Sequence, residues 1–178
     1  MPPTLKIKRV DKNVKMPVRK TSASSGVDVY GWKFLMHYKK HTVVHTWSDR
    51  LGFQIQKEDI SNNDESIIDI EPGERVLIDT GIIATVGPGH EIQVRPRSGI
   101  SLEKGLLLIN TPATIDEDYR GTIKIMFANY TIEKVSINLD VRLAQLVVCP
   151  VVISDIVEVD SFDATSRGNS GIGSTGIK

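Results

Sequence analysis

Two polar segments of the chain carry side chains that could bind and activate a phosphorylated ligand. In the first, Arg97, Ser98 and Gly99 follow a strand-like run. A guanidinium fork, a hydroxyl and a backbone amide without a shielding side chain are the donors that phosphate oxygens accept from. Because an arginine on a solvated turn has the same sequence pattern, these residues indicate a phosphate site only together with other signals.

The second segment, residues 110–121, reads as a hairpin tip followed by an acidic turn. Asp116, Glu117 and Asp118 place three carboxylates in succession. Because like charges repel, we expect at least one of them to point into a site or to bind a cation. A carboxylate within hydrogen-bond reach of a water molecule can act as its general base, and Tyr119 can offer a flat apolar face to a sugar or a base.

Three further segments are weaker signals. Gly26 and Asp28 form a Gly-x-Asp turn that enters a strand, and Gln145 interrupts a near-continuous apolar strand. A buried glutamine must find hydrogen-bond partners, so Gln145 is either a satisfied core amide or a ligand-binding group. The Gly/Ser/Thr-rich tail from Arg167 lacks the lysine spacing and the following helix of a Walker A loop. Such an arm can nevertheless close over the phosphates of a ligand.

The elements that must position these residues are strands. Alternating or continuous apolar runs lie at residues 5–10, 66–70, 76–78, 82–86, 91–94, 106–109, 122–127, 135–139 and 143–152. Gly, Pro and Asn turns separate them, and no segment keeps a helical period over ten residues or more. Residues 102–105 hold at most one helical turn closed by Gly105. The pattern predicts an all-β barrel or sandwich.

Length and composition limit the class of protein. The 178 residues fit a single domain, and 22 Lys and Arg balance 22 Asp and Glu. Zero net charge argues against a surface built for nucleic-acid backbone, so no stable nucleic-acid binding is expected. The single cysteine, Cys149, excludes an internal disulfide framework and fits a reducing compartment, which predicts a cytoplasmic location. No apolar run approaches the roughly 18 residues that span a bilayer, so no membrane association is expected.

The order and content of the five segments resemble the five motifs of the trimeric dUTPases, the deoxyuridine triphosphate nucleotidohydrolases. The matching segments are residues 25–28 (Ser-Gly-Val-Asp), 96–99 (Pro-Arg-Ser-Gly), 114–121, 142–146 (Arg-Leu-Ala-Gln-Leu) and 167–176. The resemblance covers nearly the whole chain except residues 31–65. Five motifs in the same order outweigh the ambiguity of each motif alone.

The resemblance implies a jelly-roll-like β-barrel over residues 1–160 and a flexible C-terminal arm over residues 161–178 that closes over a neighbouring active site. It also implies a homotrimer with active sites at the subunit interfaces. The expected activity is Mg²⁺-dependent hydrolysis of dUTP to dUMP and pyrophosphate, which keeps uracil out of DNA and supplies dUMP.

The resemblance also implies roles for individual residues. Asp116 would orient and deprotonate the water that attacks the α-phosphorus, and Asp28 would contact Mg²⁺ through its water shell. The substrate would be bound by Arg97, Ser98, Gly99, Asn110, Thr114, Ile115, Tyr119, Lys124, Gln145, Arg167, Ile172, Gly173, Ser174 and Thr175. In this scheme the hairpin reads uracil, Tyr119 lies against the deoxyribose, and the arm covers the γ-phosphate.

Two features depart from the family pattern. Ile172 stands where the family usually has a phenylalanine that stacks on uracil, so we expect weaker ordering of the substrate. Residues 31–65 form an atypical insert with five aromatic residues and three histidines, His37, His41 and His45. The insert is either an extended hairpin packed on the barrel or at the trimer interface, a metal site, or a surface for a protein partner.

Two alternative functions remain open at the level of sequence. A dCTP deaminase or a bifunctional deaminase-dUTPase shares the barrel, although residues 116–119 follow the dUTPase pattern. The second alternative is a weakly active dUTPase-like protein that binds a partner through the insert.

Overall fold

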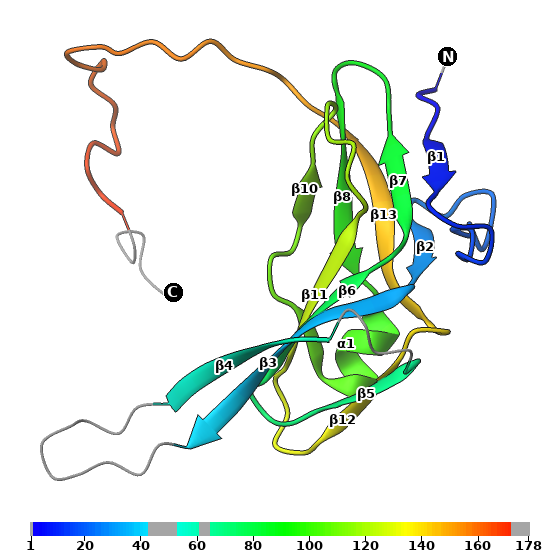
Figure 1. Ribbon diagram of the computed structural model, residues 1–178. Helices are drawn as coiled ribbons and strands as arrows, with labels where there is room; N and C mark the ends of the chain where they lie inside the picture. The colour runs from blue at the N-terminus through cyan, green and yellow to red at the C-terminus, as the bar shows by residue number, and fades with distance from the viewer. Residues whose placement is uncertain (1, 43–52, 61–64, 172–178) are drawn as a thin grey trace, which may run out of the picture.

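The computed structural model describes residues 2–42, 53–60 and 65–171 (Figure 1). The elements in these ranges are β1 (Lys6–Arg9), β2 (Val27–Tyr30), β3 (Lys33–Thr42), β4 (Phe53–Asp59), β5 (Ile67–Ile70), β6 (Arg75–Asp79), β7 (Ile82–Thr85), β8 (His90–Pro96), α1 (Ser98–Lys104), β9 (Leu106–Leu108), β10 (Ala113–Ile115), β11 (Lys124–Asn129), β12 (Val135–Asn138) and β13 (Arg142–Pro150). The all-β prediction is confirmed.

Two larger sheets form the barrel. One has the strand order β10-β8-β13-β2 and the other β4-β3-β6-β11-β9. Two short pairs, β1-β7 and β12-β5, complete the wall, and all these strands pair in antiparallel fashion. Because few neighbours in the sheets are neighbours in sequence, the sheets bring distant motifs together.

Alternation along the strands builds the core between the sheets. Val76 and Ile78 of β6 and Ile125 and Phe127 of β11 are buried, while the residues between them are half-buried and face outward. This period of two is the pleat of a strand with one face on a core. It explains why the strand positions were predictable from local sequence.

The helix is longer than the sequence pattern predicts. α1 begins at Ser98, after the extended residue Arg97, and ends at Gly105, whose φ of 62° is left-handed. The Gly105 N–H donates to the carbonyl of Ser101 at 3.1 Å, so Gly105 closes the helix as expected. The turn predicted at Ser98 and Gly99 is the first turn of this helix. A seven-residue helix is too short to show a periodic apolar pattern.

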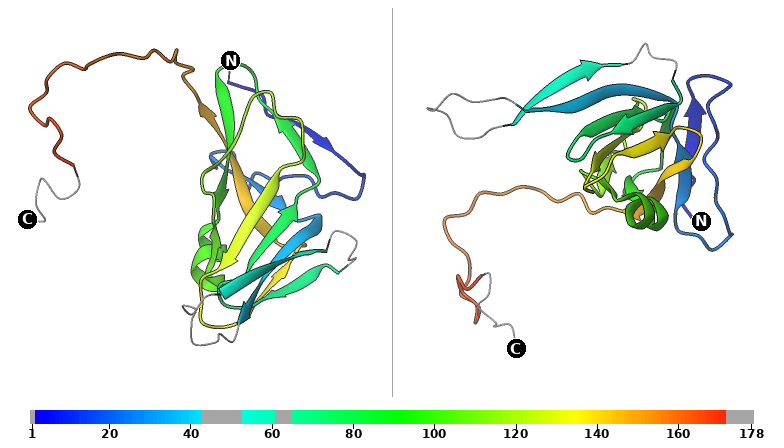
Figure 2. Two further views of the ribbon diagram at one scale, coloured as in Figure 1. Left: turned by 60° about the vertical axis from the view of Figure 1, so that its left-hand side comes forward. Right: turned by 90° about the horizontal axis from the view of Figure 1, so that it is seen from below.

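The atypical insert is built on an antiparallel hairpin of β3 and β4, which confirms the hairpin alternative. β3 pairs with β6 only as far as Tyr38, and beyond that residue it pairs with β4 alone. Figures 1 and 2 show this outer part projecting from the barrel. Near the barrel, Phe34 enters the core, and Arg75 lies 5.2 Å from the centre of the Tyr38 ring. Trp47 and the side chain of Phe53 lie outside the described residues.

His37 ties the hairpin to the barrel. Its Nε2 lies 2.8 Å from Oε2 of Glu74, and both side chains are buried. The same Oε2 accepts a hydrogen bond from the Glu71 N–H at 3.0 Å. The described residues contain no group of three potential metal ligands. The side chains of His41 and His45 lie outside the described part, so the metal alternative stays untested.

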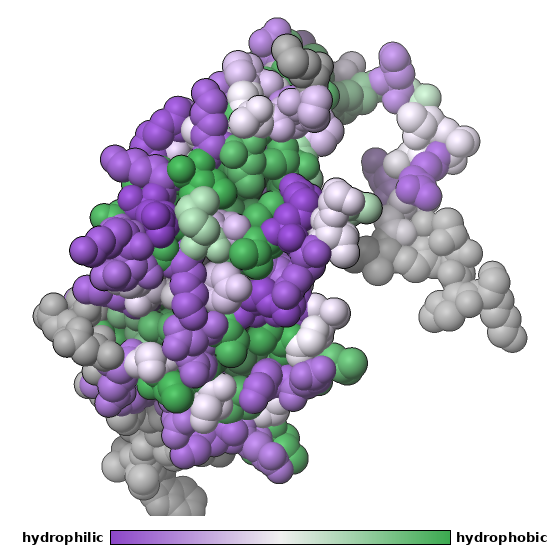
Figure 3. Space-filling view, turned by 90° about the vertical axis from the view of Figure 1, so that its right-hand side faces the viewer, coloured by the Kyte–Doolittle hydropathy of each residue, from purple (hydrophilic) through white to green (hydrophobic). Residues whose placement is uncertain are grey.

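On the face that carries β1 and the N-terminal segment, hydrophilic side chains surround patches of hydrophobic ones (Figure 3). Within residues 2–42, 53–60 and 65–171, no helix has the length and apolar character needed to cross a membrane.

The two parts of the hairpin should differ in their effect on stability. We expect Phe34→Ala to lower the free energy of unfolding by about 3–5 kcal/mol, because this ring is fully buried in the core. Replacing residues 40–55 by an Asn-Gly turn should change it by less than about 1 kcal/mol, because a shorter loop is slightly easier to close. Urea unfolding measures the free energy of unfolding of both variants. An equal decrease in the two would show that the outer hairpin also stabilises the barrel.

Candidate functional site

A buried carboxylate joins three of the predicted motifs near the start of α1. Oδ1 of Asp28 lies 3.1 Å from Nε of Arg97, and Oδ2 lies 2.8 Å from Nη1 of Arg142. Arg97 Nη1 also donates to the carbonyl of Arg142 at 2.7 Å. The Asp28 side chain is only 13% exposed, so both of its oxygens are paired with guanidinium groups away from bulk water. This arrangement fixes Arg97 from two sides.

The central strand β13 explains how these residues meet. Its Gln145 lies opposite Asp28 of β2 on one side and opposite Arg95 of β8 on the other. The pairing of β13 with β2 shifts register between Arg142 and Ala144. Sequence reasoning assigned no role to Arg142, although this residue opens the same motif as Gln145. A buried aspartate that needs a second cationic partner is the signal that could have identified it.

Gln145 is held in place by its neighbours. Its Nε2 donates to the carbonyl of Pro96 at 2.9 Å. A Cβ on Gly26 would lie 1.9 Å from Gln145 Oε1, so only glycine at position 26 leaves room for the amide. Gln145 therefore has an amide hydrogen bond within the barrel, and Gly26 has a packing role that its motif alone did not reveal.

Ser98 and Gly99 follow directly at the start of α1. Ser98 is exposed and Gly99 is half-buried. A Cβ on Gly99 would meet only Oε1 of Glu103, at 3.9 Å. This space lies open in the single subunit, beside the fixed Arg97.

The acidic turn that begins at Asp116 lies apart from the cluster around Asp28. Asp116 follows the last residue of β10 and is exposed, and its carbonyl accepts a hydrogen bond from the Tyr119 N–H at 3.1 Å. A hollow of about 470 Å³ is lined by Gly89, His90, Glu91, Asp116, Glu117, Asp118, Val151 and Ile153. The carboxylate of Asp116 thus stands at a water-accessible surface near the point where the C-terminal arm leaves the barrel.

Two contacts, with Thr122 and with Gly121, fix the side chain of Tyr119. Its hydroxyl donates to the carbonyl of Thr122 at 3.0 Å. A Cβ on Gly121 would lie 2.4 Å from that hydroxyl oxygen, so the ring lies against the bare backbone of Gly121. The ring remains partly exposed and can contact a ligand on its other side.

The remaining residues of the predicted hairpin flank β8. Asn110 is exposed in the turn between β9 and β10, and the Thr111–Pro112 peptide bond after it is cis. Ile115 packs partly against the core, and Thr114 points to the opposite, exposed side. The predicted hairpin is a long connection from β9 to β11, whose middle part, β10, pairs with β8. Three residues are too few for periodicity to predict such a strand.

Within one subunit the two predicted halves of the site are far apart. Ile115, just before Asp116, pairs with Ile92, whereas Arg97 follows the opposite end of β8. Five residues of extended strand correspond to a separation of about 17 Å. In Figure 1, α1 lies at one end of β8, and the arm leaves β13 at the other end. Asp116 and Arg97 of one chain therefore do not meet.

The C-terminal arm extends away from the barrel in each view of Figures 1 and 2. Arg167 is exposed, and its carbonyl accepts the N–H of Ser170 at 3.1 Å. Ile172, Gly173, Ser174 and Thr175 lie outside the described residues. Arg167 is not brought to Arg97 or to Asp116 of its own subunit.

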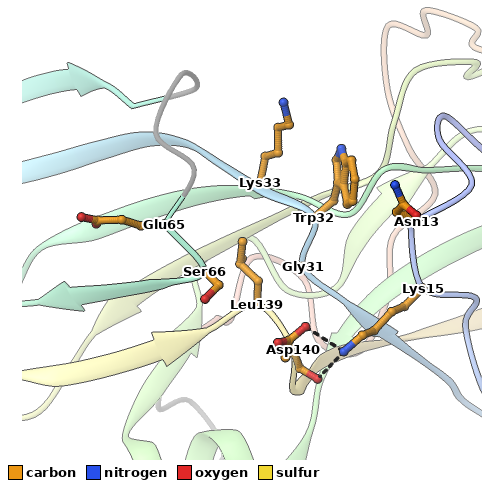
Figure 4. Close-up of a pocket in the computed structure, with 9 residues that line it drawn as sticks. All are labelled: Asn13, Lys15, Gly31, Trp32, Lys33, Glu65, Ser66, Leu139 and Asp140. Carbon is orange, nitrogen blue, oxygen red and sulfur yellow. Dashed lines mark hydrogen bonds and ion pairs between the residues drawn. The ribbon is translucent and has the colours of Figure 1, made fainter.

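Another hollow, of about 240 Å³, lies where β2 leads into β3 (Figure 4). Lys15 and Asp140 on its rim form an ion pair of 2.7 Å. None of the residues predicted for the site lines this hollow.

Comparison with known proteins agrees with the geometry. A sequence model of the dUTPase family matches residues 59–176. A deoxyuridine 5'-triphosphate nucleotidohydrolase of Nautilia profundicola is 48% identical over 60% of this chain and 75% of its own length. One of Chlamydia caviae is 46% identical over 67% of this chain and 84% of its own length.

Solved structures are similar in fold. The Staphylococcus bacteriophage 80alpha dUTPase with dUPNHPP has a TM-score of 0.71 at 21% identity, over 98% of this chain and 99% of its own. The dUTPase of the S. aureus phage phi11, described with a species-specific insert, has a TM-score of 0.65 at 20% identity, over 91% and 99%. From the matching motifs, sequence relatives and barrel, we conclude that this chain belongs to the dUTPase family and is a dUTP diphosphatase.

Proposed function

We propose that this dUTPase acts as a homotrimer whose active sites each combine halves from different subunits. The observation that carries this proposal is the separation of Asp116 from Arg97 along β8 by about 17 Å. A reacting α-phosphorus and the phosphate donors must lie within a few ångströms of the general base. A site with both halves therefore needs a second copy of the chain.

In this mechanism Asp116 is the general base. Its carboxylate accepts a proton from a water molecule while the water oxygen forms a bond to the α-phosphorus. The bond from the α-phosphorus to the oxygen that bridges to the β-phosphorus breaks, and pyrophosphate leaves. The exposure of Asp116 beside a hollow supports this role, because water has direct access to the carboxylate.

The cluster around Asp28 holds the phosphates. Nε and Nη1 of Arg97 are bonded to Asp28 and to the Arg142 carbonyl. We assign the remaining nitrogen, Nη2, to a phosphate oxygen, which a prepositioned guanidinium binds with little loss of side-chain entropy. Ser98, Gly99 and Gln145 complete this half of the site.

Mg²⁺ fits this half when it enters with the substrate. A carboxylate has about four acceptor positions, and the two arginines use two of those on Asp28, which leaves positions for water molecules around the metal. Direct coordination would place the cation beside two guanidinium charges. Mg²⁺ readily keeps water and phosphate ligands, and it would neutralise charge that develops on the phosphates.

The other half recognises the nucleoside. Asn110 and the backbone of Thr114 and Ile115 read the uracil edge, and the Tyr119 ring lies against the deoxyribose without room for a 2′-hydroxyl. The fixed ring of Tyr119 supports this role. Lys124 is the least direct member, because its ammonium is bonded to Thr122 at 2.8 and 3.0 Å.

The arm supplies the last part of each site. Its apolar side chains Val152, Ile153, Ile156, Val157 and Phe162 are 75–100% exposed, so this segment has apolar surface that a neighbouring subunit could cover. Arg167, Ile172, Gly173, Ser174 and Thr175 would then close over the γ-phosphate and the base in a neighbouring site.

The wider role remains as the sequence predicts it. Hydrolysis of dUTP would keep uracil out of DNA and supply dUMP, and a reducing cytoplasm suits the free Cys149 thiol. Absence of stable nucleic-acid binding and the possible protein partner at the hairpin stay untested.

Replacing the general base tests the mechanism. We expect Asp116→Asn to lower kcat for pyrophosphate release from dUTP at least about 100-fold, because an amide cannot accept the proton. Binding of a non-hydrolysable dUTP analogue should stay within about threefold. Glu117→Gln, the same charge change one residue along, is the matched control and should retain activity. Full activity of Asp116→Asn would exclude the proposed base.

The same assay separates the alternatives. Without Mg²⁺, in EDTA, pyrophosphate release should stop and should return when Mg²⁺ is added. Ammonia release from dCTP would instead indicate the deaminase alternative. Pyrophosphate release from dTTP or UTP at the dUTP rate would contradict the proposed base and sugar contacts.

Mixed oligomers test whether the site is shared. Asp116→Asn and Arg97→Ala chains are each expected to be inactive alone. When they are co-expressed, random assembly should restore about a quarter of the sites, because these sites take one intact half from each chain. Pyrophosphate release from purified mixed oligomers and their mass by light scattering measure this.

A matched pair provides the control. Asp116→Asn mixed with Tyr119→Ala damages the same half in both chains and should give no recovery. Recovery in this second pair, or none in the first, would contradict a site divided along β8.

A substitution at Gly26 tests the proposed phosphate-binding half of the site. Gly26→Ala should displace the Gln145 amide, because the new Cβ would otherwise lie 1.9 Å from Oε1. We expect kcat/KM for dUTP to fall about tenfold. Gly87→Ala, between β7 and β8, meets no atom within 4 Å and is the control. Unchanged kinetics in Gly26→Ala would exclude a substrate contact of Gln145.

A further inference from the structure

A hydrogen-bonded unit of Asp79, Thr122 and Lys124 lies beneath the loop that carries Tyr119. The Thr122 hydroxyl donates to Oδ2 of Asp79 at 2.7 Å. The Lys124 ammonium donates to the same hydroxyl oxygen at 2.8 Å and to the Thr122 carbonyl at 3.0 Å. All three residues are half-buried. Thr122 thus has both its side chain and its carbonyl bonded to charged partners.

This unit is anchored on the barrel. Asp79 ends β6 and lies opposite Lys124, the first residue of β11. The other oxygen of Asp79, Oδ1, accepts the N–H of Gly81 at 2.7 Å. Thr122 itself lies just before β11, so the unit fixes the point where the exposed loop of residues 116–121 joins the sheet.

Tyr119 is connected directly to this anchor. Its hydroxyl donates to the Thr122 carbonyl, which also accepts from Lys124. Because Gly121 has no side chain, the Tyr119 ring can lie directly against the backbone of the loop. The position of the ring therefore depends on where the Thr122 carbonyl is held, and that position depends on Asp79 and Lys124.

We propose that Asp79, Thr122 and Lys124 are positioning residues that hold the Tyr119 ring against the sugar and so set the preference for a deoxyribonucleotide over a ribonucleotide. The inference rests on the proposed contact between Tyr119 and the deoxyribose. A ring free to shift by a fraction of an ångström admits a 2′-hydroxyl, whereas a fixed ring excludes it. Lys124 acts in this scheme through Thr122 and not by touching the substrate.

The test compares kcat/KM for dUTP and for UTP. Thr122→Val keeps the shape of the side chain and removes the hydroxyl, and it should lower the dUTP/UTP ratio about tenfold. Thr122→Ser restores the hydroxyl and should keep the ratio within about twofold. Asp79→Asn, which keeps the volume, is the second variant and should also lower the ratio.

A threonine elsewhere provides the matched control. The Thr131 hydroxyl also donates a hydrogen bond of 2.8 Å, to Oδ1 of Asn129, in the turn after β11. Thr131→Val should lower the melting temperature without changing the dUTP/UTP ratio. An equal drop of the ratio in Thr131→Val and Thr122→Val would overturn the proposal, because it would reflect general destabilisation.

A double-mutant cycle tests the connection itself. Tyr119→Phe removes the hydroxyl that reaches Thr122 and should lower the ratio as Thr122→Val does. Because both changes release the same ring, the double variant should be no worse than either single variant. Additive losses, or an unchanged ratio in Thr122→Val and Asp79→Asn, would overturn the positioning role.

Two further variants distinguish a failure of this inference from a failure of the proposed contact between Tyr119 and the deoxyribose. If Tyr119→Ala leaves the ratio unchanged, the sugar contact itself is wrong and the inference falls with it. If Tyr119→Ala lowers the ratio and Thr122→Val does not, only the inference fails. Lys124→Met should lower the ratio; an equal loss of kcat/KM for both nucleotides would instead indicate a direct contact of Lys124 with the phosphates or base.

Discussion

The structure of this dUTPase depends on one buried carboxylate held between two arginines. Removing a charged group from water costs several kcal/mol unless it is paired and hydrogen-bonded. Asp28 meets this condition only when β2, β13 and the end of β8 keep their register, since its partners are Arg142 and Arg97. The same pairing that makes the carboxylate tolerable in the barrel also fixes a guanidinium beside the start of α1. Stability and the proposed phosphate binding therefore rely on the same contacts.

A second constraint is the length of β8. A strand is rigid, and each residue advances about 3.3 Å. β10 pairs with residues 92–94 of β8 and runs away from Arg97, which follows the last residue of that strand, so one chain does not bring Asp116 to Arg97. In the proposed function, catalysis therefore requires a second copy of the chain. The exposed apolar segment of the arm fits the same logic, because it gains cover only from another molecule.

The inserted hairpin extends the barrel without touching either half of the site. β3 joins the sheet at β6, on the side away from β9, and contributes Phe34 to the core. The buried pair of His37 and Glu74 holds it there. The strands of the Asp28 cluster and the strand that precedes Asp116, β2, β8, β13 and β10, belong to the other sheet. This separation explains how the family barrel accommodates the insert, which lies largely outside the residues matched by the family model.

The sequence by itself determined the all-β class, most strand positions and the motifs, because a period of two and turn residues are local properties. Strand β10 and the start of α1 were missed because each is too short for periodicity. Only the tertiary structure decided that Arg142 shares Asp28, that Gly26 makes room for Gln145, and that Asp79 supports Thr122. These contacts join residues that are distant in the chain, and they follow from strand register, which no local pattern encodes. Register also decided that Asp116 and Arg97, close in motif order, stand at opposite ends of one strand.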